Sequence, residues 1–236
     1  MQKTGGILLA GGRGTRLYPN TKIINKHLMP VYDKPMIYYS LSILLLARID
    51  DITIVCNPED EVIYKKLLGE GDELGINIRY STQESPNGIP DAIDTALMKS
   101  NYERFMVVLG DNFLYGREFF STLKNTFFES DDISIYYQKV RNPELYGVIK
   151  WENDHIEDLI EKPTNFLSND AVIGLYIFDN EFTTHFEKLE KSKRGEFEII
   201  DIIKQYGLKE AITNYVGRGT AWFDMGASED FFNSSQ

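Results

Sequence analysis

A short apolar run that ends in glycines constrains this chain more than any other segment. Residues 6–19 read Gly-Ile-Leu-Leu-Ala-Gly-Gly-Arg-Gly-Thr-Arg-Leu-Tyr-Pro. An apolar run of this length, bounded by glycine, predicts a buried strand over residues 6–10. Glycines after it let backbone N–H groups converge on one point, and arginine forks beside them suit a polyphosphate. An ordinary turn would need neither Arg13 nor Arg16, so we predict a phosphate-binding loop.

This segment matches neither of two common phosphate-binding loops. A dinucleotide fingerprint needs three glycines in the pattern Gly-x-Gly-x-x-Gly, and Gly12 and Gly14 fit but Leu17 takes the third place. The acidic residue that should close a second strand is also missing, since Asp33 lies in a proline-flanked stretch. A P-loop needs Gly-Lys-Thr or Gly-Lys-Ser, and neither occurs. These mismatches argue against a nicotinamide oxidoreductase and a P-loop nucleotidase.

Strand and helix patterns alternate through the first half of the chain. We expect strands at 6–10, 52–56, 76–80 and 105–109, and helices at 35–47, 60–68 and 91–99. This order predicts an α/β fold with a Rossmann-like, mostly parallel sheet flanked by helices. Such sheets bind ligands beyond the carboxyl ends of their strands. Asp111 follows one strand end and the glycine loop follows another, so we expect both at one cleft.

The second half of the chain carries more strands and fewer helices. We expect strands at 133–140, 148–152, 156–159, 172–178 and 211–216, and one helix at 198–205. This pattern predicts an antiparallel insertion. Because no repeat, low-complexity tract or proline-rich linker interrupts the chain, we expect a single domain over residues 1–236.

Composition narrows the partners of the chain. Its formal net charge of −11 argues against nucleic acid and against an anionic membrane surface. The longest apolar stretch, residues 36–47, is well short of the ~20 residues that cross a bilayer. Cys56 is the single cysteine, which excludes an internal disulfide. Because Met1 leads almost directly into the first strand without a signal-like segment, we expect a cytoplasmic protein.

Further motifs extend the pattern of the glycine loop. The loop and the segment Asn-Lys-His-Leu-Met-Pro at 25–30 resemble the sugar-1-phosphate nucleotidylyltransferases, and most closely the thymidylyltransferase branch. The chain resembles a short form that lacks the C-terminal extension of longer members. Later segments match in order and cover essentially the whole chain: 83–88, 109–112, 146–148, 161–163, 194–196 and 222–226.

The resemblance implies a reaction and its partners. A nucleotidyl group would pass from a nucleoside triphosphate, dTTP being favoured, to a sugar 1-phosphate, glucose 1-phosphate being favoured. A nucleotide-sugar and pyrophosphate would be the products. Residues from about 1 to 130 would form the nucleotide-binding half, and residues from about 131 to 236 the sugar-phosphate-binding half. We also expect a homo-oligomer, either a dimer or a tetramer.

The resemblance also implies which residues contact the nucleotide. Catalysis would rest on Arg16, Lys26 and Asp111, and Mg²⁺ on Asp111 and Asp224. Two carboxylates suit this ion, which leaves its other positions to phosphate oxygens and water. A different reading of Asp224 is a cap for a helix beginning near Ser228. The implied nucleotide-binding set is Gly11, Gly12, Gly14, Thr15, Arg16, Gln83, Gly88 and Asp111.

The sugar phosphate would be bound by a second set. Glu161 would accept hydrogen bonds from sugar hydroxyls, and Lys162 would meet the anomeric phosphate; without the resemblance, this pair before a proline is an ordinary solvated turn. The full implied set is Lys26, Tyr146, Gly147, Glu161, Lys162, Val172 and Arg194.

Three departures from the family pattern leave substrate choice open. His27 replaces a common glutamine, Ile173 replaces a common threonine, and Ile-Pro-Asp-Ala at 89–92 replaces the usual Leu-Ala-Gln-Ala. A transferase that uses UTP or CTP with another hexose phosphate is therefore a second reading. A non-catalytic module that binds sugar nucleotides is a third, although the presence together of Arg16, Lys26, Asp111 and Asp224 argues against it.

Overall fold

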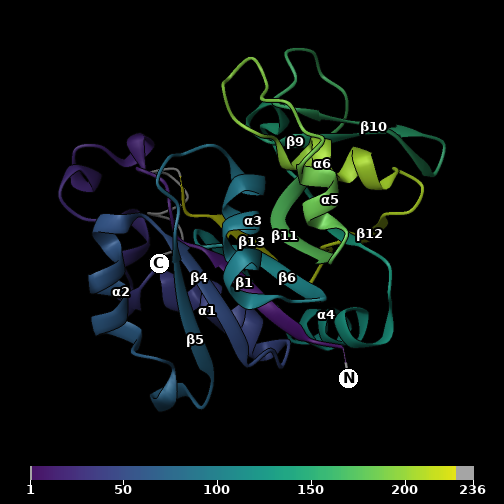
Figure 1. Ribbon diagram of the computed structural model, residues 1–236. Helices are drawn as coiled ribbons and strands as arrows, with labels where there is room; N and C mark the ends of the chain where they lie inside the picture. The colour runs from purple at the N-terminus through teal and green to yellow at the C-terminus, as the bar shows by residue number, and fades with distance from the viewer. Residues whose placement is uncertain (1, 227–236) are drawn as a thin grey trace.

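One nine-stranded sheet forms the centre of the molecule (Figure 1). The computed structural model describes residues 2–226. Along the main path the strand order is β10-β9-β11-β6-β1-β4-β5, with β8 joined to β11 and β12 joined to β8. The strands are β1 (Thr4–Leu9), β4 (Asp51–Cys56), β5 (Asn77–Thr82), β6 (Arg104–Leu109), β8 (Ser134–Lys139), β9 (Gly147–Glu152), β10 (His155–Glu161), β11 (Asp170–Asp179) and β12 (Ile212–Tyr215).

Four of these strands form the parallel part that the sequence predicts. β6, β1, β4 and β5 run side by side in parallel, and Gly6 lies opposite both Ile52 and Met106. β11 then pairs antiparallel with β6, β8 and β9, and β9 pairs antiparallel with β10. The prediction of an α/β fold with an antiparallel insertion is therefore confirmed.

Helices cover both faces of the sheet because the central strands are apolar on both sides. Leu8 of β1 packs in one core with α1, α2 and α4, while Ile7 and Leu9 pack in the other core with α3, α5 and α6. Successive side chains of a strand point to opposite faces, which explains this division. The helices are α1 (Ile37–Leu46), α2 (Glu61–Leu68), α3 (Ile89–Ser100), α4 (Arg117–Glu129), α5 (Phe182–Phe186) and α6 (Ile199–Tyr206).

Two short ladders lie outside the main sheet. β13 (Ala221–Asp224) pairs antiparallel with β7 (Asn112–Tyr115), and β2 (Pro30–Val31) pairs with β3 (Lys34–Pro35). Pro35 therefore lies in a strand, and α1 begins at Ile37 instead of at the proline. The β7–β13 ladder joins the two halves of the chain, but the division near residue 130 stays a prediction.

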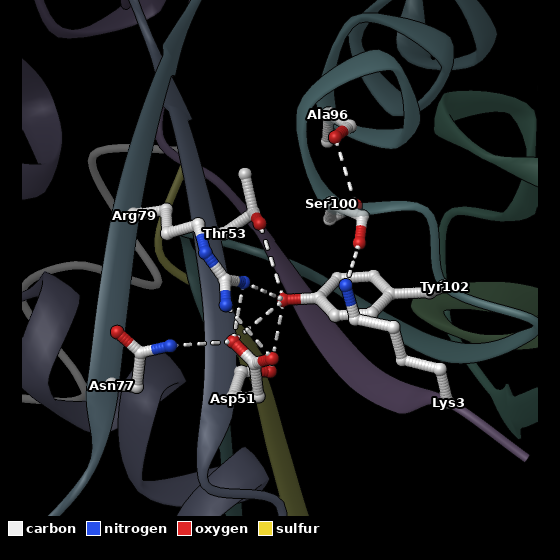
Figure 2. A network of polar contacts seen from close by, with 8 residues as sticks. All are labelled: Lys3, Asp51, Thr53, Asn77, Arg79, Ala96, Ser100 and Tyr102. Atoms are coloured by element: carbon white, nitrogen blue, oxygen red, sulfur yellow. Dashed lines mark hydrogen bonds and ion pairs between the residues drawn. The ribbon is translucent and has the colours of Figure 1, made fainter.

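The amino ends of the strands are joined by a polar network centred on Tyr102 (Figure 2). Its hydroxyl lies 3.2 Å from the Thr53 hydroxyl and 3.1 Å from the Asp51 carbonyl oxygen. Arg79 contacts both oxygens of the Asp51 carboxylate, at 2.5 and 3.1 Å. The network links β4, β5 and the start of β6 at their amino ends. The candidate site lies at the opposite, carboxyl edge of the sheet.

Within residues 2–226, no helix is both long enough and apolar enough to cross a bilayer. Cys56 is buried, as expected of a small apolar residue at a strand end.

Candidate active site

The glycine loop leaves the carboxyl end of β1 in a backbone shape that needs glycine. Gly12 has φ of 89° and Gly14 has φ of 55°, in the region that side chains rarely adopt. The Thr21 hydroxyl donates to the Gly14 carbonyl oxygen at 2.6 Å and closes the loop. Thr15 and Arg16 follow in a short 3₁₀ turn (Thr15–Leu17). The loop thus brings Arg16 to the edge of the sheet where the parallel strands end.

Lys26 and Asp111 form an ion pair at this edge. Lys26 Nζ contacts Asp111 Oδ2, and both side chains are almost fully buried. Asp111 lies two residues after the end of β6, and the Gly110 N–H donates to the Leu9 carbonyl oxygen at 2.8 Å, which holds the ends of β6 and β1 together. Burial is the largest single effect and would raise the pKa of Asp111, but the charge of Lys26 and the hydrogen bonds to the carboxylate together outweigh it and lower that pKa to about 2. Asp111 is therefore ionised at neutral pH.

His27 is buried behind this pair and is neutral. Burial first, and then the charge of Lys26, lower the pKa of His27 to about 3. Its Nδ1 lies 2.9 Å from the Asn25 side-chain oxygen, which can only accept, so Nδ1 carries the proton. The same oxygen accepts the backbone N–H of His27 at 3.0 Å. This packing fixes the short turn that presents Lys26.

Asp224 reaches Asp111 through the β7–β13 ladder. Asp224 pairs with Asn112 in the ladder, and the Met225 N–H donates to the Asp111 carbonyl oxygen at 2.9 Å. A Cβ placed on Gly226 would lie 2.9 Å from Asp224 Oδ1, 3.0 Å from Asp111 Oδ2 and 3.1 Å from Arg16 Nη2. These three side chains therefore converge on one small space.

The convergence of the buried Asp111 carboxylate and the partly buried Asp224 carboxylate fits a divalent cation. Burial and then the negative charge of Asp111 raise the pKa of Asp224, because the two carboxylates repel each other at short range. Within residues 2–226, no cluster of three or more His, Cys, Asp or Glu side chains could hold a metal. A two-carboxylate site is what Mg²⁺ uses when phosphate oxygens complete its shell. The capping alternative for Asp224 involves Ser228, which lies outside the described residues.

Two cavities meet at Asp111. The first has a volume of about 230 Å³ and is bordered by the glycine loop and α3. The second has about 250 Å³ and lies over β9, β11 and β13. Of the predicted nucleotide set, the first is lined by Gly11, Gly12, Gln83, Gly88 and Asp111, together with Lys26. The predicted residues that line the second are Arg16, Asp111, Tyr146, Gly147, Glu161, Lys162, Val172, Arg194 and Asp224.

Two predicted nucleotide residues lie outside both cavities. Gly14 and Thr15 line neither of them and instead shape the turn that leads to Arg16. The remaining residues predicted from the sequence are brought together, although they come from segments far apart along the chain.

The second cavity is rich in charged groups. Arg194 donates to both carboxylate oxygens of Glu198, at 2.8 and 3.0 Å, and lies 3.8 Å from Glu161. Burial raises the pKa of Glu161, and Lys162 Nζ lies 3.7 Å from its carboxylate. Sequence reasoning missed Glu198, which lines this cavity and holds Arg194. The i, i+4 spacing of Arg194 and Glu198 was the available signal.

A family model for nucleotidyl transferases matches residues 5–236. The chain belongs to the nucleotidyl transferase family. The glucose-1-phosphate thymidylyltransferase of Neisseria meningitidis serogroup A is 42% identical over 98% of this nucleotidyl transferase and 81% of that protein. The protein of the same name from Mycobacterium tuberculosis is 40% identical over 98% of this chain and 80% of its own length.

Solved structures share the fold of this nucleotidyl transferase. A Bacillus anthracis protein described as a glucose-1-phosphate thymidylyltransferase, crystallised with sucrose, matches with a TM-score of 0.89 and 32% identity over 98% of this chain and 94% of that one. A UDP-glucose pyrophosphorylase in complex with UDP-glucose matches with a TM-score of 0.85 and 25% identity over 100% of this chain and 97% of that one. The family resemblance drawn from the sequence is confirmed.

Proposed function

We propose that this chain transfers a thymidylyl group from dTTP to glucose 1-phosphate and releases pyrophosphate. The observation that carries the proposal is the junction of two cavities at Asp111, with Lys26, Arg16 and Asp224 around it. One cavity holds the nucleotide and the other the sugar phosphate, so the attacking oxygen and the α-phosphorus meet at the junction. The names of the similar proteins support the choice of substrates.

Charge placement supports an in-line displacement at the junction. Lys26 lines the first cavity and contacts Asp111, which lines both, so its ammonium can neutralise the α-phosphate and the attacking sugar phosphate where they meet. Arg16 sits at the end of the glycine loop, where a guanidinium can stabilise charge on the departing pyrophosphate. These groups act by position and charge, and the reaction needs no covalent intermediate with the protein.

Asp111 and Asp224 are the residues that would hold Mg²⁺. When bound, this ion supplies positive charge to the triphosphate and its transferred phosphoryl group. Lys26 already neutralises part of Asp111, and Arg16 Nη2 lies near the Asp224 carboxylate. The protein thus holds the two carboxylates close together without the ion, with a cationic side chain beside each of them.

The second cavity suits a sugar phosphate. Glu161 offers a partly buried carboxylate for sugar hydroxyls, and the charged ends of Lys162 and Arg194 lie beside it. The Tyr146 ring packs against Trp222, at 5.6 Å between centroids, on the wall beneath the junction. Gly147 leaves room above Glu161, since a Cβ there would lie 3.2 Å from the Glu161 carboxylate.

A second candidate substrate is UTP. It is favoured by the similarity to a UDP-glucose pyrophosphorylase crystallised with UDP-glucose. Thymine and uracil present the same hydrogen-bonding edge, and one methyl group in an apolar niche is worth only about 1 kcal/mol. We therefore expect only a modest preference between their nucleotides unless the 2′-hydroxyl is also sensed.

The test is pyrophosphate release across a grid of nucleotides and sugar 1-phosphates with Mg²⁺. We expect kcat/KM with glucose 1-phosphate to fall in the order dTTP, UTP, CTP. Asp111→Asn and Asp224→Asn should each remove most of the magnesium-dependent activity, because each substitution withdraws one anionic ligand. Nucleotide binding without pyrophosphate release in the intact protein would favour the non-catalytic module instead. A rate with CTP at or above that with dTTP would favour a cytidylyltransferase.

A further inference from the structure

We propose that Asp91 sets base specificity by fixing the orientation of the Gln83 side-chain amide. Gln83 lines the nucleotide cavity, and Asp91 lies behind it in the first turn of α3. The inference rests on the proposed function, because it concerns how that cavity reads a base. It makes Asp91 a positioning residue that acts through Gln83.

Two hydrogen bonds determine which way the Gln83 amide faces. Its Nε2 donates to Asp91 Oδ2 at 2.7 Å and to the Gly88 carbonyl oxygen at 3.2 Å. An amide nitrogen has two hydrogens, so both are used by these partners. The reversed amide would place its oxygen against a carboxylate and a carbonyl, neither of which can donate. The geometry therefore leaves Oε1 as the polar atom of Gln83 that can meet a ligand.

That oxygen lies on the loop side of the cavity. A Cβ placed on Gly11 would lie 3.9 Å from Gln83 Oε1, and Gly11 lines the same cavity. Gly88 has φ of 110°, and a Cβ there would collide with the Phe197 backbone, so the chain passes close behind Gln83. The amide is thus enclosed on one side by acceptors and open on the other to a base.

Asp91 is held in place by donors behind it. Lys191 Nζ donates to the Asn87 side-chain oxygen at 2.6 Å, which directs the Asn87 amide nitrogen to Asp91 Oδ1 at 3.4 Å. The Thr95 hydroxyl donates to the Asp91 carbonyl oxygen at 2.7 Å. A relay of hydrogen bonds therefore runs from Lys191 at the surface through Asn87 and Asp91 to Gln83. Each hydrogen bond fixes the orientation of the next side chain.

The fixed acceptor selects one kind of base edge. Thymine and uracil carry a hydrogen on N3, which Gln83 Oε1 can accept. Cytosine has an acceptor at N3, so it would face an oxygen with a lone pair and leave both groups unpaired. The relay thus separates thymine and uracil from cytosine, and it has no means of sensing the methyl group that separates thymine from uracil.

The experiment measures kcat/KM for dTTP, dUTP and dCTP in wild type and in Asp91→Leu. Leucine is similar in size and cannot accept, so the amide can turn and donate to cytosine N3. We expect the dTTP-to-dCTP ratio to fall about tenfold while the dTTP-to-dUTP ratio stays unchanged, since one charge-assisted hydrogen bond is lost. Asp91→Asn keeps one acceptor oxygen, so its dTTP-to-dCTP ratio should lie between those of wild type and Asp91→Leu.

Asp94→Leu is the matched control. Asp94 lies one turn further along α3, and its carboxylate accepts from the Thr183 hydroxyl at 3.0 Å instead of from Gln83. We expect both nucleotide ratios to stay at the wild-type value in this variant. An unchanged dTTP-to-dCTP ratio in folded Asp91→Leu overturns the inference, as does an equal change in both ratios, which would indicate general distortion.

Equilibrium binding of the same nucleotides with Mg²⁺ separates this inference from the proposed function. Wild type that binds dTTP but releases no pyrophosphate contradicts the catalytic proposal, and the ratio of dissociation constants then decides the role of Asp91. Wild type that binds none of the three nucleotides overturns both.

Discussion

Gly226→Ala adds one methyl group at the point where three functional side chains meet. Its Cβ would lie 2.9 Å from Asp224 Oδ1, 3.0 Å from Asp111 Oδ2 and 3.1 Å from Arg16 Nη2. Ordinary contacts of a Cβ begin at 3.4 Å, so these atoms must retreat by about 0.3–0.5 Å. The backbone of Gly226 is not in the left-handed region, so alanine is compatible with its conformation.

The turn around Gly226 has little freedom to move away. The Met225 N–H donates to the Asp111 carbonyl oxygen at 2.9 Å, and the Gly226 N–H donates to Asp224 Oδ1 at 2.9 Å. The displacement therefore falls on the carboxylates and the guanidinium. Because a misplacement of about 1 Å can cost on the order of 100-fold, we expect kcat to fall by about 10- to 100-fold. The half-saturating Mg²⁺ concentration should rise.

The assay is pyrophosphate release from dTTP and glucose 1-phosphate over a titration of Mg²⁺. Gly217→Ala is a matched control, because its Cβ would lie 2.9 Å from the Tyr215 ring but Gly217 lines neither site cavity. In an Asp224→Asn background the added methyl should lower kcat by a smaller factor than in wild type, since one of the three groups that it displaces no longer carries an anionic ligand. A folded Gly226→Ala protein with kcat and Mg²⁺ dependence within about twofold of wild type would refute the reasoning.

Arg16→Ala should lower kcat by about 10²–10³-fold, the scale of one lost preorganised charge-stabilising group, with an unchanged Tm; steady-state kinetics and calorimetry check both. Lys26→Met should lower the free energy of unfolding by about 2 kcal/mol at pH 7, because Lys26 holds the Asp111 pKa near 2 and below its unfolded value. The difference in unfolding free energy between wild type and Lys26→Met should become smaller below about pH 4, because the Asp111 carboxyl takes up a proton first in the unfolded and then in the folded protein. Urea unfolding at about pH 7 and below about pH 4 measures this difference, and an equal difference at both argues against the linkage. Tyr102→Phe should lower the free energy of unfolding by about 1–2 kcal/mol and leave kcat unchanged, because its hydroxyl serves only the amino ends of the strands. Any large change in kcat contradicts that separation.

The sequence was sufficient to predict the elements whose pattern is local. The buried strands β1, β4 and β6 are continuous apolar runs that end in polar or glycine residues, and their bounds differ from expectation by only one or two positions. Helix α4 was missed. Its buried positions Phe120, Leu123 and Phe127 have helical spacing, but Gly116 and several aromatic residues weaken the signal.

Long-range contacts explain the rest of what the sequence left open. Asp111 and Asp224 are far apart in the chain, and the β7–β13 ladder, with the Met225–Asp111 hydrogen bond beside it, brings them together. No local pattern specifies that ladder, so their proximity could be expected only from the family resemblance. Asp91 and Glu198 were not identified as positioning groups, because each acts by holding a neighbour whose direction depends on the folded backbone.

The shared wall between the two cavities predicts a pattern of inhibition. Asp111, Leu109, Ile89 and Glu196 line both spaces. A nucleotide-sugar fills both spaces at once, so it should raise the apparent KM of each substrate. Pyrophosphate resembles only the triphosphate, so it should compete with the triphosphate. Two covalently joined substrate fragments should bind more tightly than either alone, because the second fragment is presented at a high effective concentration.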